Sequence, residues 1–160
     1  MPVETPLVPG DIPFPQYSTT DSEFLKNAVP STKGEIMTLD AAGRLIAVVG
    51  AGVIADLRRG AFQAQVTRVA PTAEDTDEIQ VLKQRSRIVL KANVNLSPGD
   101  AVEPLTVGGV VTPDKVQVAP AGTHTQGFLG RIFQIYTLGT DGIKKQFTAD
   151  DDLVIVDMEG

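Results

Sequence analysis

The stretch LIAVVGAGVIADLRRG, residues 45–60, contains the residues most open to a chemical interpretation. An apolar run leads into Gly50 and Gly52, and acidic residues follow a little over twenty positions downstream. In a dinucleotide-binding fold, such glycines turn a strand into a helix whose N-terminus holds the pyrophosphate. Here only about two helical turns fit before Gly60, and the next residues alternate with a period of two. Short glycine motifs often match by chance, so we expect a β-meander and no nucleotide.

Few other residues have the types or spacing that catalysis or metal binding needs. His124, the single histidine, lies in a loop rich in Gly and Thr, without a nucleophile motif. The acidic run at 149–152 lacks the spaced ligands of a calcium loop, and we interpret it as a solvated loop, like the run at 74–78. Lys115 follows a Gly-Asp-x-Val turn of the kind found in biotinyl and lipoyl carrier domains, but it lacks the flanking residues of their modified lysine. We therefore predict no enzyme, no cofactor, no metal site and no small-molecule substrate.

The composition is that of one domain with an aliphatic core. The 160 residues are 42% hydrophobic but only 5% aromatic, and none is cysteine. A chain of this length can bury a sizeable core, which must consist of Val, Ile, Leu and Ala. The net charge of −6 disfavours a nucleic-acid partner, which selects a basic surface. No apolar run approaches the ~20 residues of a membrane helix and no signal peptide is recognisable, so we also expect no membrane partner.

Residues 1–33 differ in character from residues 34–160. Six of the eleven prolines lie in the first 30 residues, which excludes a central strand or a long helix there. A capping pattern in 20–28 predicts one or two helical turns. Large apolar residues punctuate the segment, whereas disordered linkers usually lack them. We expect an extended, proline-stiffened arm that docks on a partner, the alternative being a frayed terminus; the predicted docking residues are Val3, Leu7, Val8, Ile12, Phe14 and Tyr17.

From residue 34 onward the apolar residues recur with a period of two, which predicts strands. Fifteen glycines, many of them between these runs, predict frequent turns, including one at 97–100. The fold class is therefore mainly β: a small antiparallel barrel or sandwich behind the extended N-terminal arm. The predicted strands lie in 35–40, 44–49, 52–56, 61–69, 87–96, 101–105, 109–112, 115–119, 127–138 and 152–158.

Three of these strands carry the clearest burial pattern. Residues 127–138 and 152–158 are apolar on both faces, and we expect them to be the most buried strands and the surface through which the body trimerises. The residues of 87–96 expected on one buried face are Ile88, Leu90, Ala92, Val94 and Leu96, and only Val89 breaks the alternation.

The order of glycine-punctuated strands resembles that of the capsid decoration, or cement, proteins of tailed bacteriophages. The resemblance covers residues 28–160 and lies in four parts. A hairpin, GEIMTLDAAGRLIAVV, follows a proline-rich lead, and AGVIAD and RRGAFQAQV come next. VNLSPGDAVEPLTVGGVVTP matches a recurrent Gly-Asp-x-Val segment with a later glycine. GFLGRIFQI and DLVIVDM match the last two strands, whereas the loops before 87 and at 136–152 are longer than in compact members.

The resemblance implies a small β-barrel or β-tulip subunit that forms a homotrimer and works by adhesion, without catalytic residues. Its partner would be the major capsid protein, bound at threefold or quasi-threefold positions on the outer surface of the virion's head, which it would stabilise. Two alternatives stay open: another virion β-protein, such as a tail or baseplate component, and a hammerhead-type carrier domain.

Overall fold

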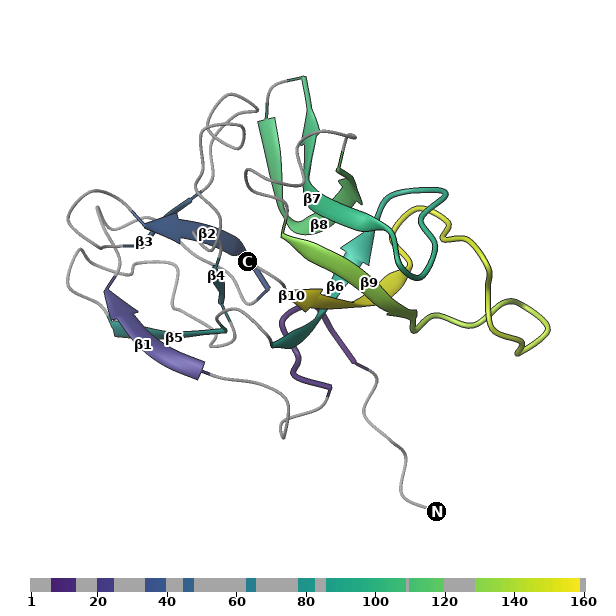
Figure 1. Ribbon diagram of the computed structural model, residues 1–160, viewed down its shortest axis with the longest axis horizontal. Coiled ribbons are helices and arrows are strands. Elements are labelled where there is room, and N and C mark those ends of the chain that lie inside the picture. Colours follow the sequence, from purple (N-terminus) through teal and green to yellow (C-terminus); the bar gives the residue numbers. More distant parts are fainter. Residues whose placement is uncertain are drawn as a thin grey trace, which may run out of the picture.

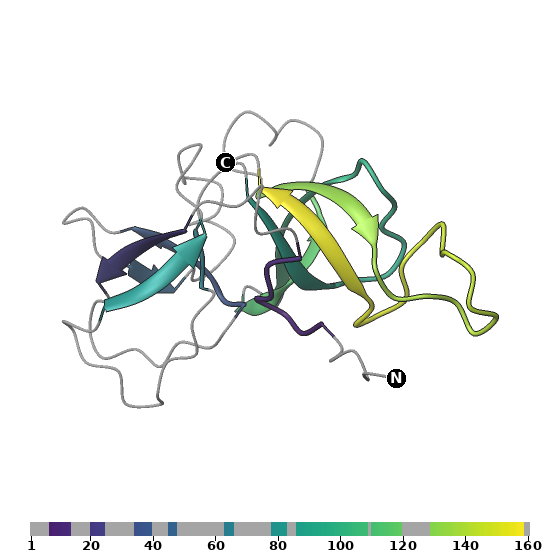
Figure 2. The ribbon, with the colours of Figure 1, turned by 90° about the horizontal axis from the view of Figure 1, so that it is seen from below.

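The computed structural model describes residues 7–13, 20–24, 34–39, 45–47, 63–65, 78–82, 86–108, 110–119 and 129–158. These residues are mainly β, and no helix occurs among them, which confirms the predicted fold class. Their strands form a five-stranded sheet and a closed five-stranded barrel, which Figures 1 and 2 show beside each other.

The barrel contains the later strands of the chain, in the order β10-β6-β8-β7-β9. Four of its five pairings are antiparallel, as the alternating pattern predicted, but β6 and β8 run parallel. That parallel pairing is short and joins Lys91 with Lys115 and Ala92 with Val116. The barrel strands are β6 (Arg87–Ala92), β7 (Ala101–Val107), β8 (Val110–Val118), β9 (Gly130–Ile135) and β10 (Leu153–Met158).

The core lies inside the barrel and is aliphatic, as the composition predicted. Alternate residues of β6 and β10 point into it, so that Leu90 and its cross-strand partner Val154 are both fully buried. Val89 and its partner Ile155 lie outside this cluster and are nevertheless buried. Burial on both faces explains why Val89 breaks the alternation of its strand. The core cluster contains Ile36, Ile88, Leu90, Ala92, Leu96, Val102, Val116, Leu129, Ile132, Ile135, Val154, Val156 and Met158.

Residues 7–13 of the proline-rich segment lie along β6. The backbone N–H of Gly10 donates to the carbonyl of Val89 at 2.8 Å, and the N–H of Val89 donates to Asp11 at 3.0 Å. Ile12 packs against the barrel core. Gly34 lies against this segment with φ +91°, and a Cβ there would come within 2.9 Å of the Pro9 carbonyl carbon. This part of the segment is therefore bound to the chain's own barrel.

The second sheet has the order β1-β5-β4-β2-β3. The predicted hairpin of 35–40 with 44–49 is confirmed, because β2 and β3 pair antiparallel with Thr38 opposite Ile46. The predicted helical turns in 20–28 are wrong for 20–24, which form a strand paired with β5, because cross-strand partners outweigh a local capping pattern. The bounds are β1 (Thr20–Phe24), β2 (Ile36–Leu39), β3 (Leu45–Ala47), β4 (Gln63–Gln65) and β5 (Glu78–Leu82).

Three details of the barrel differ from the sequence predictions. Val94, placed with the buried residues, is 49% exposed, because β6 ends at Ala92 and the chain turns at Asn95 with φ +62°. The two short strands expected in 109–112 and 115–119 are one strand, β8. β9 alternates between buried and exposed residues and leaves Phe133 exposed, so only one of its two faces is buried. β10 is as buried as predicted.

The close approach of β9 and β10 requires a glycine at residue 130. A Cβ there would lie 2.0 Å from the backbone oxygen of Asp157, which no side-chain rearrangement can relieve. We expect Gly130→Ala to lower the free energy of unfolding by roughly 1–3 kcal/mol, measured by urea titration. Gly108→Asn is the control, because nothing lies within 4 Å of that Cβ and Asn tolerates the φ of +57°. Equal loss in both variants would contradict the steric explanation.

Candidate functional site

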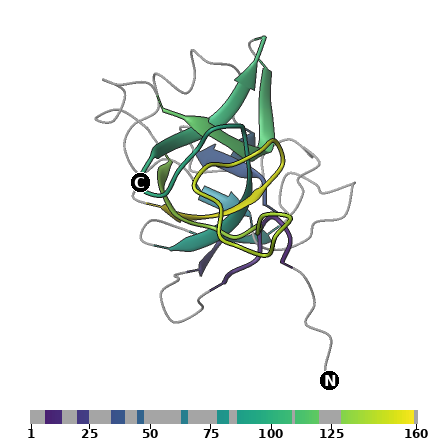
Figure 3. The same cartoon turned by 90° about the vertical axis from the view of Figure 1, so that its right-hand side faces the viewer.

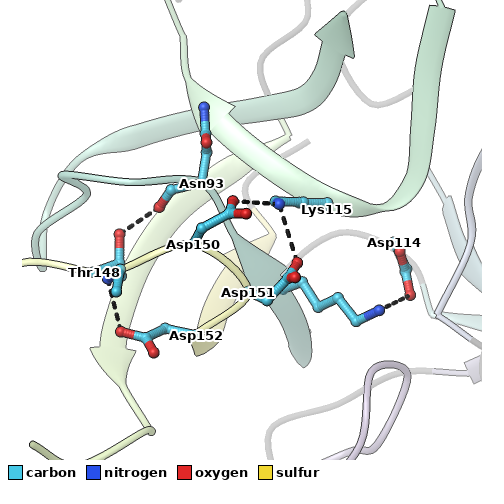
Figure 4. Close-up of polar contacts among 9 residues, drawn as sticks. Asn93, Asp114, Lys115, Thr148, Asp150, Asp151 and Asp152 are labelled. Atoms are coloured by element: carbon cyan, nitrogen blue, oxygen red, sulfur yellow. Dashed lines mark hydrogen bonds and ion pairs between the residues drawn. The ribbon is translucent and has the colours of Figure 1, made fainter.

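Lys115 and the acidic run at 149–152 meet at the seam where β8 joins β6 (Figure 4). The Lys115 ammonium donates to Asp150 Oδ1 at 2.5 Å and to Asp151 Oδ1 at 3.0 Å. The lysine side chain is only 11% exposed, whereas both carboxylates are more than half exposed. Asp151 adopts φ +64°, a left-handed conformation that Asp tolerates better than most residues. The predicted solvated loop is thus held to the barrel by a lysine.

The environment of Lys115 favours its charged form. The hydrogen bond to Asp150 raises the pKa of the Lys115 amine above its ordinary value of 10.5, burial opposes that shift, and Asp151 reinforces it. A lysine that reacts as a nucleophile or carries a prosthetic group must lose its proton and be accessible. Lys115 is instead a buried ammonium within a strand, and its role here is to bind two carboxylates.

Thr148 fixes the same loop to the end of β6 through its hydroxyl and its backbone. Its Oγ1 accepts from the N–H of Leu96 at 2.9 Å and donates to the carbonyl of Asn93 at 2.5 Å. Its backbone N–H donates to Leu96, and its carbonyl accepts from the N–H of Asn95. Thr148 is only 4% exposed, so water could not replace these hydrogen-bond partners if they were lost.

A second lysine neutralises the remaining carboxylate of the loop. Asp152 Oδ2 accepts from Lys145 Nζ at 2.7 Å and from the backbone N–H of Ala149 at 2.8 Å. The three carboxylates of 150–152 therefore face two ammonium groups, which leaves little negative charge to attract a cation. Among the described residues, no group of three or more His, Cys, Asp or Glu side chains is arranged to hold a metal ion.

Residues 136–147, which we call the finger, project from this clamped base (Figures 1 and 2). The finger's turn is held by its own backbone: Gly139 N–H donates to Ile143 at 2.8 Å, Gly142 N–H donates to Gly139 at 2.9 Å, and Leu138 bridges Lys144. Asp141 Oδ1 also accepts from the N–H of Ile143. At its base, Thr137 Oγ1 accepts from the N–H of Leu153 in β10 at 2.8 Å. The exposed apolar residues of the finger are Tyr136, Leu138, Ile143 and Phe147.

A second projection consists of residues 103–108 and 110–114, which we call the ribbon (Figure 1). Here β7 and β8 pair with each other, whereas β9 reaches β7 only at 101–102 and β6 reaches β8 only at 115–116. Val107 and Val110 face each other at its end and are 64% and 70% exposed. Exposed apolar groups of this kind on ordered elements are typical of interaction surfaces.

The structure separates the residues that the sequence singled out as an arm. Leu7 is half-buried, Val8 is 48% exposed, and Ile12 packs on the barrel core. Their role in docking stays a prediction, as does the boundary at residue 33. The residues that lie outside the described part of the chain are Val3, Phe14, Tyr17, the glycines of 50–60 and His124.

Sequence reasoning did not find the lysine clamp or the finger. Nothing in the sequence places Lys115 beside Asp150, because the contact depends on how β8 returns to β6. The finger had a usable signal: the turn residues Gly-Thr-Asp-Gly at 139–142 lie between apolar Leu138 and Ile143, a pattern typical of hairpins. The apolar residues of β10, expected at a trimer contact, are buried within this chain.

No protein-family model matches this chain, and no curated protein matches it in sequence. In the part of the chain that the structure describes, there is no helix long and apolar enough to cross a membrane. The site is therefore defined by its own geometry: a lysine clamp at the barrel seam, with an ordered apolar finger beyond it.

Replacing Thr148 by valine tests the clamp at its buried hydroxyl. Valine keeps the shape but leaves the Leu96 N–H without its side-chain acceptor, so we expect a loss of about 1–3 kcal/mol in unfolding free energy. Thr148→Ser, which keeps the hydroxyl, is the matched control and should lose clearly less. Urea denaturation of both variants is the measurement, and equal losses would show that the hydroxyl is unimportant.

Replacing Lys115 by methionine removes the ammonium and keeps most of the stem. Because both carboxylate partners are largely exposed, we expect a loss of at most about 1 kcal/mol at low ionic strength, less in high salt. The pKa of Lys115 is higher in the folded protein than its ordinary value of 10.5. The stabilisation is therefore fully present below pH 10.5 and is lost as the pH rises through the folded-state pKa. Unfolding free energies of both proteins should therefore converge in strong alkali, and a difference constant from pH 8 to 12 would contradict the charge mechanism.

Proposed function

We propose that this protein decorates the head of a tailed bacteriophage, where it binds the major capsid protein on the outer surface and stabilises the shell. It acts as a homotrimer at threefold or quasi-threefold positions and works by adhesion, without catalysis. In the C-terminal part of this chain, the segments that resemble decoration proteins coincide with observed strands. Residues 94–113 contain β7 and part of β8, and residues 127–135 and 152–158 contain β9 and β10.

The observation that carries the proposal is the ordered exposure of apolar side chains on two projections of a rigid barrel. An adhesive protein needs surface that is apolar and already in its bound shape, because ordering a loose segment on binding costs affinity. The finger and the ribbon meet this need, with Ile143 and Val110 as their most exposed apolar residues. Large exposed apolar groups on a protein with net charge −6 favour a protein partner.

The carrier alternative finds no support at Lys115. A carrier domain presents its lysine at a hairpin tip, whereas Lys115 lies within β8 and is bound to two carboxylates. A tail or baseplate component would use the same kind of apolar surface. Labelling of intact particles with a gold-conjugated antibody, viewed by electron microscopy, distinguishes it: label on the head supports our proposal, and label on the tail overturns it.

The N-terminal segment would add a second contact with the capsid. Because residues 10–12 are bound to the barrel, Val8 next to them is held at a fixed position. Val8 is exposed there and is available to a partner. Three such segments on one trimer bind in series at high effective concentration, so weak individual contacts add up to firm attachment.

We expect Val8→Asp to weaken binding to undecorated heads about tenfold or more, because it places a charge where an apolar contact forms. Co-sedimentation of purified protein with heads over a range of concentrations gives the affinity. Val94→Asp is the matched control, since Val94 is equally exposed at 49% against 48% and lies in a turn of the barrel. If the two variants bind heads equally well, the N-terminal segment has no part in docking.

A further inference from the structure

Residues 8–11 form a turn that holds its own shape. The N–H of Asp11 donates to the carbonyl of Val8 at 3.0 Å, and Asp11 Oδ2 accepts from the N–H of Val8 at 2.8 Å. Pro9 and Gly10 occupy the two central positions, and Gly10 adopts φ +91°. Proline followed by a residue at positive φ is typical of a type II turn. The turn therefore carries within itself the contacts that fix its shape.

The barrel binds this turn at the edge of β6 that faces away from β10. Among the described strands, β8 pairs with β6 only at residues 91–92, so β8 does not cover the edge beside Val89. Both hydrogen bonds between the turn and β6 use the backbone of Val89, so its N–H and carbonyl point away from β10. Figure 1 and Figure 3 show residues 7–13, in purple, against the barrel. The turn thus takes the place of a neighbouring strand at Val89.

Two further contacts determine which peptide fits at this edge. Gly34 lies against the turn, and a Cβ on it would come within 2.9 Å of the Pro9 carbonyl carbon and 3.0 Å of the Gly10 nitrogen. Gly10 is itself buried, and Ile12 packs on the barrel core. We call Gly34 and the backbone of Val89 the seat. The seat therefore fits a turn with glycine at its third position and an apolar side chain two residues later.

We propose that the seat is a specific binding site for a Pro-Gly turn, and that residues 8–12, which occupy it, are a latch that opens while the barrel stays folded. The latch bonds to β6 at Val89, whereas β10 pairs with β6 over five residue pairs. Segments with few bonds to the body of a protein open locally at a lower free energy than global unfolding. Closed, the latch covers a strand edge that would otherwise be open to pairing with another chain. The inference goes beyond capsid decoration and does not depend on it.

Two full-length variants with the same substitution separate the latch from its seat. Gly10→Ala places a side chain at φ +91° within the latch, which disfavours the closed state and leaves the seat unchanged. Gly34→Ala places the same side chain at the same φ within the seat, where it obstructs any bound turn. The probe is a free peptide with the sequence of residues 7–13, LVPGDIP, which carries a fluorophore at its amino end and an amide at its carboxyl end.

Fluorescence anisotropy of the labelled peptide measures its affinity for the seat. We expect the peptide to bind Gly10→Ala about tenfold more tightly than the unchanged protein, because its apparent affinity follows the fraction of molecules with an open latch. Gly34→Ala should bind the peptide about tenfold or more weakly than Gly10→Ala, although its latch is open too, because its seat is obstructed. Equal binding to the two variants, or no binding to Gly10→Ala, overturns the seat.

Hydrogen exchange tests whether the latch opens without the barrel. The Val89 amide faces the latch and the Leu90 amide faces β10, because neighbouring residues of a strand direct their N–H groups to opposite edges. In Gly10→Ala we expect exchange at Val89 to rise about tenfold while Leu90 stays protected, and added peptide should restore the protection of Val89. An equal rise at both amides would show that the turn opens only with the barrel, which overturns the latch.

Discussion

Two pairings in the barrel join only two residue pairs each, and one of them, between β6 and β8, is the parallel seam that holds the acidic loop. Lys91 and Ala92 of β6 meet Lys115 and Val116 of β8 there, and the N–H of Asn93 extends the seam to the carbonyl of Val116. A seam this short has few hydrogen bonds of its own. The loop at 148–152 lies across it and contacts both strands, through Thr148 to the end of β6 and through Asp150 and Asp151 to β8. Closure of the barrel and placement of the finger therefore depend on the same contacts.

The charged groups that drew attention in the sequence are used for structure. An acidic run next to a lysine could indicate a cation site, a carrier lysine or a nucleophile, depending on geometry. Here the ammonium of Lys115 lies between Asp150 and Asp151 and bonds to both, and these bonds raise the pKa of Lys115 further. The exposed apolar side chains lie elsewhere, on a turn and on a ribbon, each held in place by backbone hydrogen bonds.

The sequence predicted the barrel strands better than their surroundings, and it did not predict β1 and β5 of the second sheet. Alternation in 87–92 and the double-sided apolar run at 153–158 identify β6 and β10, because burial on one or both faces leaves a direct trace in the residue types. The prediction for Val94 is wrong because the alternation continues beyond the end of β6 into a turn, where alternate residues do not lie on one buried face. Thr20–Phe24 was misread because its capping residues suit a helix, whereas its partner strand lies more than fifty residues away. The lysine clamp and the parallel seam are long-range contacts, which local patterns do not encode.

The position of β10 has a consequence for how this protein is made. It lies between β6 and β9, and it is the last of the described strands in chain order. Until residues 153–158 leave the ribosome, β6 and β9 each have an open edge and the barrel cannot close. The barrel therefore folds only after almost all of residues 86–158 have been translated. Until then the nascent chain exposes apolar, aggregation-prone strands. A chaperone that shields such strands would therefore raise the yield of folded protein.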